Sequence, residues 1–250
     1  MRQWLHELDE LLRGGKTQAD RLAVGTDHLP VGLYAVVCVV LGAIYGAAMG
    51  LYSVLSREPA VPIQVPASAI KVPMLFLCTL IVTFPSLYVF SALLRTRLRP
   101  VDAMRLLVAS ITVNLAVLAS FAPITVFFTL TTTSYPFMKL LSFAFFVVAG
   151  LIGLGFLLKA LNRLEVPASP VPDEGEAAEA QYDEAAPAPN RSGRRVFRVW
   201  LVIYSLVGAQ MGWVLRPFIG TPDLPFTWFR QRGGNVFLDV IRTLGELFNN

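Results

Sequence analysis

The chain has 250 residues and a formal net charge of +4, and 15% of its residues are charged, whereas a soluble domain usually carries about a quarter. Hydrophobic residues make up 55% and the mean hydropathy is +0.59, which favours an integral membrane protein over a soluble domain. Most basic residues lie just outside apolar runs and not on one patch, which disfavours nucleic-acid binding.

The N-terminal segment, residues 1–29, predicts an amphipathic helix that lies on the cytoplasmic membrane surface. It contains acidic residues and has no continuous apolar region, so it is not typical of a signal peptide. Its apolar residues recur on one helical face, which suits packing on lipid, on the protein's own loops or on a partner subunit. These residues are Trp4, Leu5, Leu8, Leu11 and Leu12.

Residues 30–163 predict a four-helix transmembrane bundle. A helix needs about 20 apolar residues to cross a hydrocarbon core of about 30 Å. Four runs meet that length, the third of them within the uncharged interval Leu106–Met138. The runs are Val31–Val54, Val72–Leu94, the segment ending near Leu130, and Leu140–Leu158.

The composition changes abruptly at residues 164–195, which are acidic and rich in Pro and Ala. Such a segment buries too little apolar surface to offset its chain entropy, so we expect a disordered linker that is either a solvated spacer or a tether for a basic partner. Residues 196–220 predict a fifth span with the apolar core Val199–Leu215. Residues 221–250 predict a second amphipathic segment, with apolar residues from Val236 to Phe248 on one face.

The basic residues also predict the orientation. They are frequent in the N-terminal segment and in the second and fourth loops, and rare in the first and third loops. The N-terminal segment and the second and fourth loops should therefore lie on the cytoplasmic side of the inner (plasma) membrane. Five spans would place the C-terminus outside. Four basic residues of the C-terminal segment disfavour that side, which leaves a four-span arrangement with the C-terminus inside as the alternative. They are Arg216, Arg230, Arg232 and Arg242.

The first span carries the clearest packing signal. Gly42, Gly46 and Gly50 recur at four-residue spacing and would form a groove along one helix face. Such a groove lets another helix backbone approach closely within lipid. The approaching helix is either another span of the same chain or a second copy of the protein.

Two prolines predict kinks inside spans. Pro85 removes the backbone donor that would reach the Ile81 carbonyl, and nearby Thr and Ser hydroxyls are placed to satisfy the freed groups. Pro123 predicts a second kink, in the third span. Asn114 and Gln210 are expected to make polar contacts inside the membrane, either with another helix or with a substrate path.

The sequence contains none of the motifs that indicate reaction chemistry. The five predicted spans lack Asp, Glu, Lys, Arg and His, because Lys71 and Lys139 fall at span boundaries. P-loop, HExxH, GxSxG and GxGxxG motifs are absent from the sequence, and Cys38 and Cys78 lie in separate apolar runs. We therefore expect no enzyme activity, no cofactor and no metal site.

The segment AQMGWVLRPFIGTP resembles the closing signature of a group of poorly characterised bacterial multi-spanning membrane proteins. In that group the last span ends in Gln-Met-x-Trp-x-Leu-Arg-Pro-Phe-x-Gly, which matches Gln210 to Gly220 here. GAIYGAAMG and SAIKVPMLFLCTLIVTFPSLYVF are similar to a distantly Yip1-like arrangement of helices. The resemblance covers most of residues 30 to 232 and implies a bacterial inner-membrane protein with no assigned reaction.

Arg216 is the residue of this segment that stands out. It follows the last span on the side that the positive-inside rule disfavours. Its side chain would either extend to lipid phosphates as an interface anchor or bind an acceptor at the mouth of the bundle.

Two functions fit these observations. The first is a non-enzymatic organising or accessory subunit of a membrane complex, in contact with lipid and with a partner or a second copy. The second is a channel or transporter with an uncharged path lined by Asn114, Gln210 and the segment Thr129–Ser134.

Overall fold

The computed structural model describes residues 2–15, 30–56, 61–93, 100–164, 191–216, 218–220, 226–229 and 236–248. Within these ranges all regular structure is helical, which confirms the predicted all-α class. The helices are α1 (Arg2–Leu12), α3 (Val31–Gly50), α4 (Tyr52–Leu55), α5 (Gln64–Leu93), α6 (Pro100–Thr131), α7 (Tyr135–Leu164), α8 (Arg191–Leu215) and α9 (Val236–Phe248).

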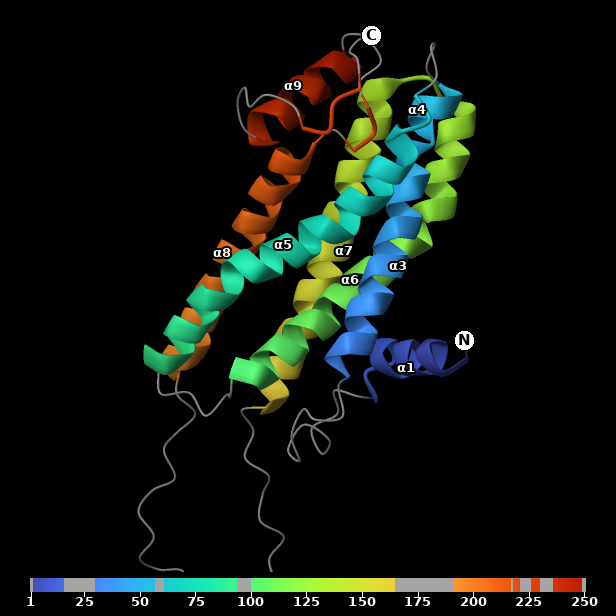
Figure 1. Ribbon diagram of the computed structural model, residues 1–250. Coiled ribbons are helices and arrows are strands. Elements are labelled where there is room, and N and C mark those ends of the chain that lie inside the picture. Colours follow the sequence, from blue (N-terminus) through green and yellow to red (C-terminus); the bar gives the residue numbers. More distant parts are fainter. Residues whose placement is uncertain are drawn as a thin grey trace, which may run out of the picture.

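Four helical segments are long and apolar enough to cross a membrane, as the sequence predicts. They form an all-α membrane bundle in which α3 packs against α5 and α6, and α6 packs against α7 (Figure 1). The short helix α1 lies across one end of the bundle, and α9 lies at the opposite end (Figure 1). The four segments are Val31–Leu55, Gln64–Ser86, Val101–Thr131 and Tyr135–Ala160.

The helices that could cross a membrane extend beyond the predicted spans and include charged residues near their ends. Hydropathy placed the start of the second span after Lys71, but α5 begins at Gln64 and Lys71 lies two turns inside it, 1% exposed. Lys139 likewise lies in the second turn of α7, and Asp102 lies in the first turn of α6.

The glycine groove of α3 is filled by α5 of the same chain. A Cβ added at Gly46 would lie 2.8 Å from Ala69 Cα, and one added at Gly50 would lie 2.6 Å from Val65 Cα. A Cβ at Gly42 would lie 3.0 Å from Pro73 Cβ. Of the two arrangements that the sequence left open, the structure therefore has the internal one, and these glycines are not available to a second copy.

Both predicted kink residues lie inside continuous helices, Pro85 in α5 and Pro123 in α6. Figure 1 shows that α5 bends along its length. Thr79, Thr83 and Ser86 donate hydrogen bonds to carbonyls of their own helix, those of Leu75, Thr79, Leu80 and Thr83. Among the hydrogen bonds found in the described ranges, none of the three hydroxyls reaches the Ile81 carbonyl, contrary to our expectation.

Helix α8 is part of the bundle and not a separate one-span unit. It runs antiparallel along α5 (Figure 1). The Trp200 indole donates to Ser86 Oγ at 2.9 Å near one end of the pair, and a Cβ added at Gly212 would lie 3.4 Å from Leu75 Cδ1. Its apolar part, Val199–Leu215, is shorter than the four segments above.

The predicted linker lies mostly outside the described residues. Helix α7 ends at Leu164 and α8 begins at Arg191, so the last five residues of the segment 164–195 belong to α8. The two amphipathic segments do form helices, α1 and α9, at the two ends of the bundle.

Candidate functional site

The polar residues that the sequence proposed for a transport path do not meet. Gln210 is exposed on the outer side of α8 and forms no hydrogen bond with any residue that the structure describes. Asn114 lies on α6 against Gly153 of α7, where its buried Oδ1 has no hydrogen-bond partner. The hydrogen bond between these two helices is made by Ser110 instead, whose Oγ donates to the Gly153 carbonyl at 2.7 Å.

The segment Thr129–Ser134 makes local contacts at the end of α6. Thr129 Oγ1 donates to the Thr125 carbonyl at 2.8 Å, and Thr131 Oγ1 donates to the Phe127 carbonyl at 3.0 Å. The Thr133 carbonyl accepts a hydrogen bond from the Tyr52 hydroxyl at 2.6 Å. These threonine hydroxyls satisfy their own helix, as is common in membrane helices, and do not converge on a path.

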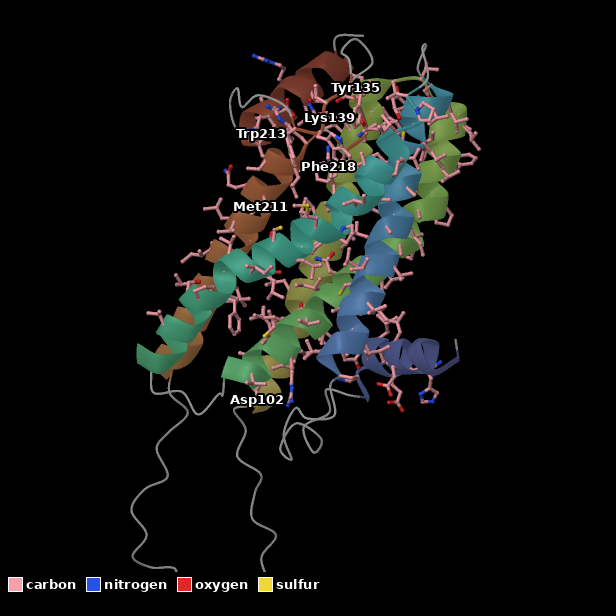
Figure 2. The ribbon with its side chains drawn as sticks, viewed as in Figure 1. Asp102, Tyr135, Lys139, Met211, Trp213 and Phe218 are labelled. Atoms are coloured by element: carbon pink, nitrogen blue, oxygen red, sulfur yellow. The ribbon has the colours of Figure 1, made fainter. Side chains whose placement is uncertain are left out.

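Several polar contacts between distant parts of the chain lie at the end of the bundle where α8 ends. We use "C-terminal cap" for the described residues of this part, 218–220, 226–229 and α9. Figure 2 shows Phe218, Lys139 and Tyr135 at this end of the bundle, with Trp213 of α8 nearby. Three groups of contacts hold the cap on the starts of α5 and α7.

The first contact fixes the chain directly after α8. The Phe218 carbonyl accepts hydrogen bonds from Gln64 Nε2 at 2.9 Å and from Ser68 Oγ, both in the first turns of α5. The Phe218 ring lies 6.3 Å from that of Phe146 of α7. Gly220 then turns the chain with a positive φ of 81°, and a Cβ there would lie 3.3 Å from Ser53 Cβ.

The second contact is made by Lys71. Its ammonium lies 5.9 Å from the ring centroid of Trp228 and 5.7 Å from that of Phe229. Both distances are within the range of cation–π attraction. The two rings are 47% and 55% exposed, while Lys71 itself is buried. Lys71, which the hydropathy pattern assigned to a span boundary, therefore contacts the cap through its ammonium group.

The third contact fixes α9. Lys139 Nζ lies 2.5 Å from Asp239 Oδ2 and donates to Thr243 Oγ1 at 2.9 Å. Thr243 is buried and in turn donates to the Asp239 carbonyl at 2.7 Å. Because Asp239 and Thr243 are one turn apart, they present their side chains to the same lysine and set the rotation of α9 about its axis.

The Arg216 side chain lies against an aromatic ring of its own helix. Its guanidinium carbon lies 3.5 Å from the ring centroid of Trp213, one turn earlier on α8. The Trp213 indole N–H is buried without an acceptor. Arg216 thus stacks on an aromatic ring at the helix end, a geometry that suits the planar guanidinium group.

The contacts at this end of the bundle hold the cap in place. Across the described ranges, no group of three or more His, Cys, Asp or Glu residues could hold a metal ion. The cap contacts consist of a carbonyl held by two donors, a cation on two rings, and an ion pair with a hydroxyl. Each of them fixes the position of a segment.

The sequence reasoning missed the residues that hold the cap. Each of these residues contacts a residue far away in the chain. In each contact, the sequence had assigned one of the two residues to a loop or to a span boundary. A signal was present for two of them, because a lysine near the end of a membrane helix either extends to the interface or pairs inside the bundle. The missed residues are Gln64, Ser68, Lys71, Lys139, Asp239 and Thr243.

Comparison with known proteins gives no identification. No family model, no curated protein and no solved structure matches the chain.

Proposed function

We propose that the protein is a non-enzymatic organising or accessory subunit of a membrane complex, and that the C-terminal cap is the part that meets its partner. The observation that carries the proposal is the attachment of the cap through Lys71, Lys139 and the Gln64–Ser68 pair. Three separate attachments on one short stretch of chain hold a surface in a fixed orientation, and a fixed surface lowers the entropy cost of binding.

The cap exposes several large apolar side chains. On α9 the side chains of Asp239 and Thr243 contact the lysine of α7, while Ile241 and Leu244 are 65% and 40% exposed. Trp228 and Phe229 add two exposed aromatic rings. Large apolar side chains in this arrangement are typical of surfaces that bind a protein or lie on lipid.

The arrangement of the polar residues disfavours the channel alternative. Asn114 faces α7, and Gln210 points outward from α8. The hydroxyls of Thr125, Thr129 and Thr131 donate hydrogen bonds to carbonyls of their own helix, α6. A path would need such groups to face one another along the bundle, so the accessory role has the better support.

The proposal includes a location and an orientation. We place the protein in a bacterial inner membrane with α1 on the cytoplasmic side and α9 outside, and with α8 as a fifth crossing. The alternation of basic loops supports the orientation, and the antiparallel packing of α8 along α5 supports the fifth crossing. Relationship to the Yip1-like group rests on the resemblance of Gln210–Gly220 and is part of the same proposal.

The size of the native complex tests the function. Tagged protein in mild detergent is expected to migrate on a native gel with a second polypeptide, identified by mass spectrometry. Replacing Ile241 and Leu244 together by Gln should remove that polypeptide and leave the melting temperature of the purified protein unchanged. Arg242→Gln, also exposed on α9, is the matched control and should keep the complex.

The proposal is contradicted if the protein migrates free of other polypeptides, or if the Ile241/Leu244 variant retains the complex as fully as the Arg242 variant does.

A further inference from the structure

Helix α8 has two distinct faces. Trp200, Leu201 and Leu215 are buried against the bundle. The opposite face carries Val199, Ile203 and Leu206, which are 55%, 39% and 50% exposed, together with the exposed Gln210. Gln210 therefore stands in an otherwise apolar stripe that no described part of the chain covers.

The packing of α8 on α5 gives the depth of Gln210. A Cβ added at Gly208 would lie 3.6 Å from Thr79 Cγ2, and Gly212 faces Leu75. Gln210 is midway between these two glycines, so it is level with the centre of the membrane-crossing segment Gln64–Ser86. A primary amide at that depth is costly in lipid unless another polar group pairs with it.

The spacing of the stripe indicates what would cover it. Val199, Ile203, Leu206 and Gln210 are separated by four, three and four residues. This is the heptad spacing of a left-handed pair of helices. A β-branched residue at one core position and Leu at the next favours two parallel strands, and a single polar residue in such a seam fixes its register.

We propose that α8 pairs with α8 of a second copy of this protein through Val199, Ile203, Leu206 and Gln210. A two-fold axis along the membrane normal puts both Gln210 side chains at the same depth. A primary amide both donates and accepts, so each Gln210 Nε2 can donate one N–H to the Oε1 of the other and neither amide is left without a polar partner. The pairing uses neither the glycine groove nor the cap; it rests on the proposed fifth crossing by α8 and not on the accessory role.

Disulfide crosslinking of the full chain in its membrane tests the seam. Leu206→Cys is introduced into a chain that also carries Cys38→Ala and Cys78→Ala. Oxidation of this variant is expected to give covalent dimers. Ser205→Cys is the matched control, because Ser205 is also exposed on α8 but lies off the stripe. Equal crosslinking at both positions, or a product containing a different protein, would overturn the proposal.

A second measurement isolates the amide. Labelled protein is diluted with lipid in phospholipid vesicles, and single-molecule photobleaching counts the dimers at each protein density. The fraction of dimers as a function of density gives the dissociation constant of the dimer. Gln210→Leu should raise it about tenfold, the effect of losing an interhelical hydrogen bond, while Gln210→Asn should keep most of the affinity. The variants alter an exposed side chain, and an unchanged melting temperature checks their fold. A protein that stays monomeric at every density, or a Gln210→Leu constant within about twofold of the original, would refute the pairing.

Discussion

At Gly46 the α3 and α5 backbones approach closely, because an added Cβ would lie 2.8 Å from Ala69 Cα. Gly46→Ala is expected to lower the free energy of unfolding by about 1–3 kcal/mol, the usual cost of overpacking. Gly150→Ala is the matched control, since a Cβ there meets nothing within 4 Å. Unfolding in detergent should separate the two variants. Equal stabilities would show that α3 and α5 are farther apart than described.

The Trp200–Ser86 hydrogen bond gives a second prediction at the residue scale. Trp200 is 1% exposed, and Ser86 Oγ accepts its indole N–H. Ser86→Ala removes the acceptor of this buried hydrogen bond, which should cost about 1–3 kcal/mol. Ser120→Ala removes an exposed hydroxyl of α6 and should change the stability by less than about 0.5 kcal/mol. Equal stability of the Ser86→Ala and Ser120→Ala variants would mean that α8 does not pack against α5 at this point.

At the scale of elements, the attachment of α9 depends on one lysine. Lys139→Gln removes the ion pair with Asp239, and hydrogen exchange of the α9 amides should then become severalfold faster. Exchange in α3 and α6 should stay unchanged, because their packing does not involve Lys139. The double variant Lys139→Asp with Asp239→Lys should restore part of the protection. If hydrogen exchange of the α9 amides is unchanged in Lys139→Gln, contacts other than the Lys139–Asp239 ion pair hold α9 on the bundle.

Sequence patterns predicted the helices and the glycine groove because both depend on local spacing. The span lengths follow from apolar runs, and the groove from three glycines four residues apart. The cap could not be predicted in the same way, because Lys139 and Thr243 are 104 residues apart and Ser68 and Phe218 are 150 apart. The start of α5 was missed because hydropathy ends a span at Lys71, whereas the fold covers that charge with two aromatic rings.

The molecule as a whole is expected not to conduct ions. Purified protein in planar bilayers should give no current at any voltage or lipid composition, because the polar residues proposed for a path face different directions. Reproducible conductance that changes with Asn114→Leu would restore the channel alternative.

In the proposed topology, α8 crosses the membrane beside α5 and carries the cap to the side opposite α1. Labelling of intact cells with a membrane-impermeant maleimide tests it most directly, in a background with Cys38→Ala and Cys78→Ala. Thr227→Cys, exposed in the cap, should be labelled from outside, and His6→Cys, exposed on α1, should be labelled only after the cells are opened. Labelling of both residues from the same side of the membrane would contradict the five-crossing account.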